Sequence, residues 1–241
     1  PDFGGGDVGP DVSLARVRVL PLALGAAAIA VLIALGVWQV ERRAWKLNLI
    51  AQVERRLAAA PVAAPAPNRW QAIGKDDAYT RIVATGRYRS NADTYTQAST
   101  DLGAGYWVIT PLDTGSWTVL VNRGFVPPRE RGRHPAPAGE QRVTGLLRVT
   151  EPNGGFLRRN DPAADRWYSR DVAAIAAKRG SPRVAPYFID ADASGATWPR
   201  GGLTVVRFPN NHLVYALTWF GLAAMVAFLL ARSLRAEKDE R

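Results

Sequence analysis

The sequence has no cysteine and only two histidines among its 241 residues, and these shortages exclude several kinds of site. A chain without thiols forms no disulfides, no Cys-based zinc centres and no covalent c-type haem linkages, and it offers no thiol nucleophile. The remaining residues contain no nucleophile elbow, no phosphate-binding glycine loop and no paired-histidine helix. The sequence therefore predicts a protein that is not an enzyme.

The titratable residues that stand out have ordinary explanations. His134 lies in a loop rich in arginine and proline, residues 129–139, where a solvated histidine is expected. Asp190 and Asp192 are close in sequence, but without a cleft such carboxylates indicate a solvated turn more often than an acid–base pair. We assign no catalytic residue to this chain.

Charge is absent from two long apolar runs, residues 19–40 and 213–231. At about 1.5 Å per helical residue, each run can cross a bilayer core of roughly 30 Å. The first run could instead be a secretory signal peptide, but it is longer than a usual signal core. It also ends at Trp38, followed by Arg42 and Arg43, instead of at a small-residue cleavage site. We therefore predict two transmembrane helices.

The expected fold class is an α+β membrane protein in which these two helices flank a mainly antiparallel, β-rich domain with one or two short helices. A helical pattern at 44–59 continues the first span, and an acidic cap and a glycine bound a short helix at 171–179. Runs rich in β-branched and aromatic residues predict strands at 81–88, 106–112, 117–125, 141–149 and 186–190. The predicted parts are a disordered tail (1–15), a first span (16–40), the domain (41–208), a second span (209–231) and a charged tail (232–241).

Small residues recur along both predicted spans. Lipid gives helices no hydrophobic reason to pair, so close backbone approach along small side chains is the expected contact. The predicted seams are Ala23, Ala27, Ala30 and Ala34 in the first span and Ala216, Ala223 and Ala227 in the second.

The formal net charge of +10 lies in the domain between the spans. The segment before the first span sums to −1 and the segment after the second sums to +1. A basic domain held at a membrane favours anionic lipid headgroups or an acidic protein face. No nucleic-acid recognition module is visible, so we expect membrane lipids and proteins, and no nucleic acid, as partners.

A polar cluster opens the second span. His212, Tyr215, Ala216 and Trp219 follow the spacing that places residues on one face of a helix. One interpretation is an interfacial aromatic belt with a hydrated histidine. The other is a site for a flat aromatic ligand. Capping by the preceding asparagines would place His212 at the positive end of the helix, which disfavours imidazolium and leaves a neutral nitrogen able to bind iron.

Cations and indoles gather at the same membrane face from the first span, where Trp38, Arg42 and Trp45 share a helix face and Arg43 is adjacent. Tryptophans that anchor at headgroups and arginines that snorkel explain this pattern without a ligand. A haem site explains it as well, since haem needs an axial nitrogen, flat apolar walls and cations for two propionates. The candidate residues are His212 as axial iron ligand, Tyr215, Trp219 and Trp38 as walls, and Arg42 and Arg43 for the propionates.

Several motifs resemble those of the Surfeit locus protein 1 family, membrane assembly factors of cytochrome c oxidase. The likeness runs from Leu35 to Ala224 and is most specific at the opening of the second span, residues 211–219. Phe125 stands where the family commonly has tryptophan. The other matching segments are residues 35–39, Arg42, 45–46, 86–88, 105–112, 119–127, 145–148, 160–162, 167–168 and 170–171.

The resemblance implies a domain outside the cytoplasm and a role in supplying or holding haem a for the catalytic subunit of cytochrome c oxidase. It also implies His212 as the proposed haem ligand, and the haem a synthesis machinery as a partner. Haem donor and scaffold both remain open. The alternative is a permanent accessory subunit of a respiratory oxidase that binds no cofactor. A membrane-tethered enzyme would need a catalytic cluster that the sequence does not contain.

The positive charges give conflicting indications of topology. Four cations after residue 231 place the C-terminus inside, whereas Arg42, Arg43 and Lys46 after the first span indicate the opposite orientation. We give the cations after the first span less weight, because the positive-inside rule is weaker for long translocated domains. The predicted location is a bacterial inner membrane with both termini cytoplasmic and a periplasmic domain, and the mitochondrial inner membrane is less favoured.

Overall fold

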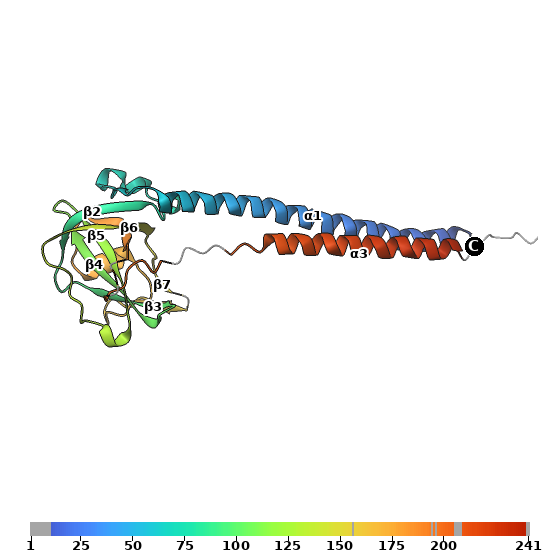
Figure 1. Cartoon of the computed structure of the whole chain (residues 1–241). Helices are drawn as coiled ribbons and strands as arrows, with labels where there is room; N and C mark the ends of the chain where they lie inside the picture. Colours follow the sequence, from blue (N-terminus) through green and yellow to red (C-terminus); the bar gives the residue numbers. More distant parts are fainter. Residues whose placement is uncertain (1–10, 156, 194, 196, 205–208, 240–241) are drawn as a thin grey trace, which may run out of the picture. The chain divides into compact units, whose positions relative to one another are not determined.

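The computed structural model describes residues 11–155, 157–193, 195, 197–204 and 209–239, with side chains from Leu20 to Ala236 within those ranges. The described residues divide into two units (Figure 1). One unit contains the chain up to Ala51 together with residues from Pro209 onward, and the other contains Gln52 to Thr204. Each unit is described by itself.

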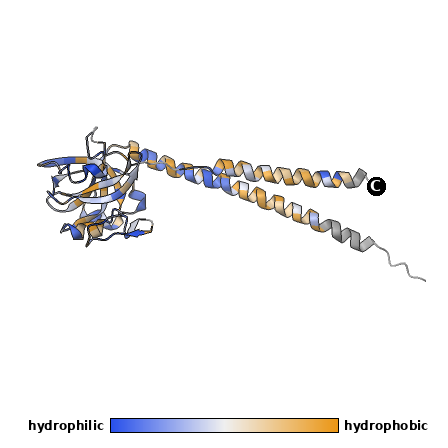
Figure 2. Ribbon diagram, turned by 90° about the horizontal axis from the view of Figure 1, so that it is seen from below, coloured by the Kyte–Doolittle hydropathy of each residue, from blue (hydrophilic) through white to orange (hydrophobic). Residues whose placement is uncertain are grey.

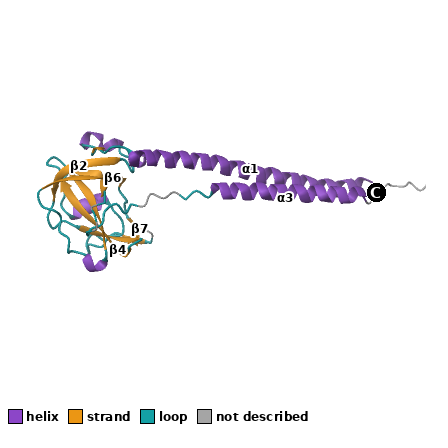
Figure 3. Ribbon diagram, in the orientation of Figure 1, coloured by secondary structure: helices purple, strands orange, loops and turns teal. Residues whose placement is uncertain are grey.

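The second unit is built on a sheet whose strand order is β1-β2-β6-β9-β5-β4-β3. A further pairing of β2 with β4, in which Tyr88 lies opposite Leu112, closes five of these strands into a barrel. Most pairs are antiparallel, while β5 and β9 run parallel. The strands are β1 Val62–Ala63, β2 Arg81–Tyr88, β3 Thr94–Thr100, β4 Gly103–Asp113, β5 Thr118–Val126, β6 Glu140–Val149 and β9 Val184–Ala191, with a separate pair of β7 Gly154–Gly155 and β8 Arg158–Arg159 (Figure 3).

Two apolar clusters lie on opposite faces of β5, so all of its residues are buried. Side chains from all five barrel strands, such as Leu112, Val121 and Ile189, form the first cluster inside the barrel. Leu120 and Phe188 point to the other face, beneath helix α2 (Val172–Lys178), which covers them with fully buried Ile175. Burial on both faces explains why β5 contains the uninterrupted apolar run 119–121 instead of an alternating pattern.

The predicted fold class is confirmed, and each predicted strand corresponds to an observed one. Helix α2 begins after Asp171, whose carboxylate accepts a hydrogen bond from the backbone N–H of Ala174, and Gly180 follows it with a φ of 58°. Strand β3 was not predicted because its sequence, Thr-Tyr-Thr-Gln-Ala-Ser-Thr, has no apolar alternation. The remaining short elements are the 3₁₀ helices η1 Pro67–Ala72, η2 Lys75–Asp77 and η3 Pro128–Glu130.

The two long helices, α1 (Asp11–Ala58) and α3 (His212–Asp239), contain the apolar spans (Figure 2). The segments Leu20–Ala58 and His212–Ala236 have mean hydropathies of 2.5 and 2.2 and are long and apolar enough to cross a membrane. Residues 11–15 are helical, although the sequence predicted a disordered tail through residue 15. The helix can extend beyond the span because the stretch rich in glycine and proline ends at Pro10. The rest of that predicted tail, residues 1–10, lies outside the described residues.

The helices pack along a seam that differs from the predicted one on α1. All four alanines of the predicted α1 seam are exposed, and two glycines make the close contacts instead. A Cβ added at Gly25 would lie 2.9 Å from Leu230 Cδ1, and one added at Gly36 would lie within 2.7 Å of the Phe220 ring. Large α3 side chains thus fill space left by glycine. On α3, Ala216 and Ala223 are buried as predicted, whereas Ala227 is exposed.

Candidate functional site

His212 is the first residue of α3, and its ring faces α1. The carbonyl of Asn211 accepts a hydrogen bond from the backbone N–H of Tyr215, so Asn211 occupies the capping position. The Nδ1 atom of His212 lies 2.7 Å from Oε1 of Gln39, a residue that is only 9% exposed. Because an amide oxygen can only accept, this bond assigns a proton to Nδ1, so that Nε2 is the nitrogen that carries the lone pair in the neutral ring.

The α3 aromatics divide between two directions. Trp219 is half-buried beside buried Ala216, on the face that packs against α1. Tyr215 is 54% exposed and lies at the edge of that face. His212 and Trp219 are therefore brought to the helix pair, whereas Tyr215 is available from outside it.

The α1 residues also separate into two faces. The guanidinium of Arg42 stacks on the Trp45 ring at 3.9 Å from its centroid, and Trp38 is 53% exposed. These three residues share the face predicted for them. Arg43 is half-buried one helical turn after Gln39, so it belongs to the face that reaches His212.

Sequence reasoning missed Gln39. It is an uncharged polar residue near the end of an apolar span, and polar residues inside spans usually face a partner helix. The position of Gln39 in the span could have indicated a contact with the other helix, although the sequence does not identify the contacting residue.

Asp190 is not in a solvated turn, contrary to the prediction. It lies on β9, is 3% exposed and accepts hydrogen bonds from four side chains. The donors and distances are Asn122 Nδ2 at 2.8 Å, Arg148 Nη1 at 2.7 Å, Thr204 Oγ1 at 2.9 Å and Arg170 Nη1 at 3.3 Å. The physical reason is that the strand turns this carboxylate towards cations from β6 and from the segment before α2. Asp192 instead pairs with Arg81 near the surface.

Glu151 extends this charge cluster. Its Oε1 accepts from Arg170 Nη2 at 2.6 Å. Burial acts to raise the pKa of Glu151, but hydrogen bonds and positive charge from Arg170, with a contribution from Arg148, outweigh burial and leave the pKa below its usual value. The cluster is well satisfied and positions the last strand and Thr204, so we assign it a structural role.

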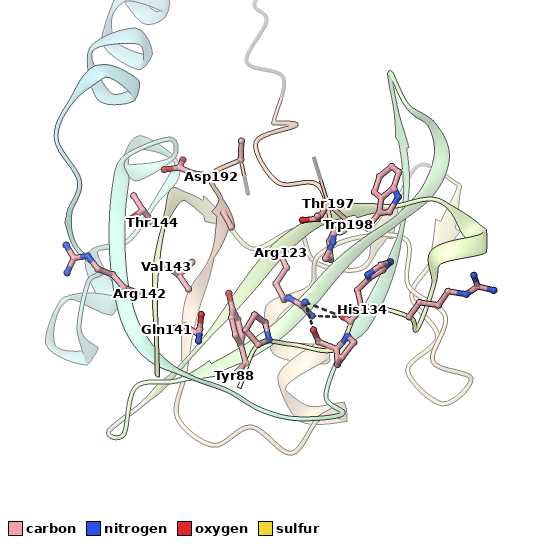
Figure 4. Close-up of a pocket in the computed structure, with 16 residues that line it drawn as sticks. Tyr88, Arg123, His134, Gln141, Arg142, Val143, Thr144, Asp192, Thr197 and Trp198 are labelled. Atoms are coloured by element: carbon pink, nitrogen blue, oxygen red, sulfur yellow. Dashed lines mark hydrogen bonds between the residues drawn. The ribbon is translucent and has the colours of Figure 1, made fainter. Parts of the chain in front are cut away.

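A cavity of about 560 Å³ opens at one end of the barrel, and Tyr88, Arg123 and His134 are among its lining residues (Figure 4). Arg123 donates to the carbonyls of His134 and Pro135 at 2.9–3.2 Å, so this nearly buried cation holds the loop over the barrel. Burial raises the pKa of Tyr88 to about 12, with the Arg123 charge opposing the shift. The prediction for His134 was wrong: the ring is half-buried and its Nε2 lies 2.9 Å from Glu130 Oε2.

Within the residues whose side chains are described, no group of three or more His, Cys, Asp or Glu is placed to hold a metal ion. A histidine with one ring nitrogen fixed by a neighbour is a different kind of site, since it can provide a single axial ligand to a metal that other groups already hold.

Two helices long and apolar enough to cross a membrane, a polar histidine–glutamine pair between them and a separate closed β-barrel are typical of a membrane protein with a large domain outside the bilayer. The SURF1 family model matches residues 26–224, and the chain belongs to this family. Surfeit locus protein 1 of Rattus norvegicus is 36% identical over 222 residues, covering 82% of this chain and 70% of the rat protein. The Homo sapiens protein is 35% identical over 223 residues, with coverages of 81% and 71%. A SURF1-like protein of Monosiga brevicollis is 34% identical over 212 residues, with coverages of 79% and 78%.

Proposed function

We propose that this protein is an assembly factor for cytochrome c oxidase that binds haem a, or hands it to the catalytic subunit, where α3 begins. The observation that carries the proposal is the bond between His212 and Gln39, which assigns a proton to Nδ1 and so makes Nε2 the ligating nitrogen of the neutral ring. A porphyrin iron accepts such an imidazole nitrogen as an axial ligand. Membership of the SURF1 family supports the role in oxidase assembly.

The surrounding residues fit the chemistry of the group. Trp219 and the exposed rings of Tyr215 and Trp38 offer apolar surface near the membrane boundary. Arg43, on the face of Gln39, and Arg42, which is exposed over Trp45, offer guanidinium groups for carboxylates. The residues that would hold haem a are therefore His212, Trp219, Tyr215, Trp38, Arg42 and Arg43.

The proposal also includes partners and a location. The partners are the catalytic subunit of the oxidase and the machinery that makes haem a. We place the protein in a bacterial inner membrane with both termini in the cytoplasm and the barrel in the periplasm, because the cations that follow α3 favour that orientation.

The replacement His212→Ala tests the proposal most directly. Full-length protein, coexpressed with haem a synthesis enzymes and purified in detergent, is expected to show a Soret band. The His212→Ala variant is expected to lose that band because no other residue of the site carries an imidazole, and the indole nitrogens of Trp38 and Trp219 are donors only. His134→Ala is the matched control and should keep the band, since His134 lies in the barrel domain and pairs with Glu130.

The outcome also separates this function from that of a permanent accessory subunit. A wild-type protein that carries no haem under these conditions, but copurifies stoichiometrically with mature oxidase, would contradict the cofactor proposal and favour the accessory role.

A second variant tests the cations. In Arg42→Gln/Arg43→Gln the iron ligand is intact, so the Soret band should remain while haem a is held about tenfold or more weakly, because charge-assisted hydrogen bonds to propionates are lost. The measurement is haem transfer to excess apomyoglobin, followed optically. An unchanged transfer rate would remove these arginines from the site. Arg55→Gln/Arg56→Gln, farther along α1, has the same charge change and serves as the control.

A further inference from the structure

The hairpin formed by β7 and β8 presents a leucine to solvent. Leu157, immediately before β8, is 88% exposed, the highest value among the exposed large hydrophobic residues described. Its φ is 59°, in the left-handed region that a leucine adopts only at a cost in free energy. Neither burial nor local geometry explains why leucine stands here.

Two arginines follow this leucine and are available for an anion. Arg158 and Arg159 are both exposed, and neither has a carboxylate partner among the described residues. Arg158 donates only to the neutral Gln97 Oε1 at 3.3 Å and lies over the Tyr168 ring. The nearby Arg166, in contrast, is neutralised by Asp161 at 2.7 Å.

The arginines border a recess of about 370 Å³ that Asn160 and Tyr168 also line, together with the Asp161–Arg166 ion pair, in which the carboxylate is already neutralised. Guanidinium groups bind phosphate through paired hydrogen bonds, and an amide and a phenol can add further donors. The recess therefore has the chemistry of a phosphate-binding surface, with an apolar side chain standing beside it.

A second exposed leucine lies at the same end of the domain. The bond from Arg158 to Gln97 places β8 against β3, and the turn after β3 carries Leu102, which is 42% exposed. Residues of that turn line a cavity together with Gly202, Leu203 and Thr204.

The connection to α3 is short. Only eight residue steps separate Thr204 from His212, and an extended chain covers at most about 3.5 Å per step, or roughly 28 Å in all. Because α3 is apolar from its first turn, a bilayer that α3 enters holds the domain on a tether no longer than this.

We propose that the β7–β8 hairpin docks on a bilayer of anionic phospholipid, with Leu157 entering the interface and Arg158 and Arg159 binding headgroup phosphates. Charge complementarity selects this occupant, since the domain carries the positive charge of the chain and the hairpin adds two cations that no carboxylate neutralises among the described residues. Docking orients the barrel on the membrane. It does not depend on the cofactor proposal.

The absence of native cysteine makes a single-probe experiment direct. Full-length Leu157→Cys is labelled with an environment-sensitive fluorophore and reconstituted in bilayers of phosphatidylcholine alone or with phosphatidylglycerol, each with nitroxide-labelled lipid. The probe is expected to shift to the blue and to be quenched by the labelled lipid in the anionic bilayer. Ser116→Cys, in the exposed turn at the opposite end of β4, is the control and should report water in both bilayers.

Neutralising Arg158 and Arg159 in the protein labelled at position 157 tests whether these arginines bind the headgroups. Removal of two cations at about 1 kcal/mol each should lower the ratio of docked to undocked domain roughly 30-fold in Arg158→Gln/Arg159→Gln. The matched control, Arg87→Gln/Arg142→Gln, removes the same charge from exposed positions on β2 and β6 and should leave quenching unchanged.

Three outcomes would overturn the proposal. The probe at position 157 could report water in the anionic bilayer, as the probe at position 116 does. Quenching could persist at full strength in Arg158→Gln/Arg159→Gln. A blue shift without quenching by labelled lipid would indicate that a second copy of the protein covers the leucine.

Discussion

Replacing Asp190 with alanine is expected to lower the free energy of unfolding of the β-rich domain by about 3–5 kcal/mol. The carboxylate is 3% exposed and accepts bonds from Asn122 and Arg170 at Oδ1 and from Arg148 and Thr204 at Oδ2. Removing it leaves a cluster with two arginines and only Glu151 as counter-charge. The measurement is urea unfolding of the full chain in detergent, followed through the fluorescence of buried Trp167.

Asp192→Ala is the matched control, two residues away on the same segment. Its carboxylate pairs with Arg81, but the side chains are 38% and 28% exposed, so solvent already screens the pair. The expected loss is at most about 1 kcal/mol. Equal losses for the two variants would show that the buried cluster does not carry the stability assigned to it.

Much of the fold could be predicted because its signals are local. Strand β2 was predicted with the observed bounds, Arg81–Tyr88, since a run of strand-forming residues bounded by turn residues marks it in the sequence. The two spans follow from uninterrupted apolar composition. The closure of the barrel could not be predicted, because the pairing of Tyr88 with Leu112 depends on the register between distant strands.

The difference between local patterns and contacts of distant residues also explains which features of the candidate site could be predicted. The shared face of Trp38, Arg42 and Trp45 is a property of one helix and follows from periodicity alone. The burial of Asp190 was missed because its partners come from other strands and loops, up to 68 residues away. The prediction of the α1 seam was wrong because the contacting side chains on α3, Phe220 and Leu230, decide which small residues of α1 lie in the helix contact.

Gln39 combines a local signal with a distant contact. It is a single polar residue in an apolar span, and its role depends on a partner 173 residues away. As the acceptor for Nδ1–H, it determines which nitrogen of His212 is free. Such outer partners of metal-binding histidines orient the ring and raise its basicity, and their loss typically weakens metal binding 10- to 100-fold. The site therefore consists of a ligand and the residue that sets its tautomer.

The replacement Gln39→Leu is accordingly expected to weaken haem a binding about 10- to 100-fold while leaving His212 and the helix pair in place. Gln39→Glu keeps an acceptor for Nδ1–H and should restore binding. The imidazole nitrogen chemical shifts of His212, measured without haem, should report an Nδ1–H tautomer in the wild type and in Gln39→Glu, and a shift towards Nε2–H in Gln39→Leu. If Gln39→Leu changes neither the tautomer nor the affinity, the histidine acts without this partner and its free Nε2 needs another cause.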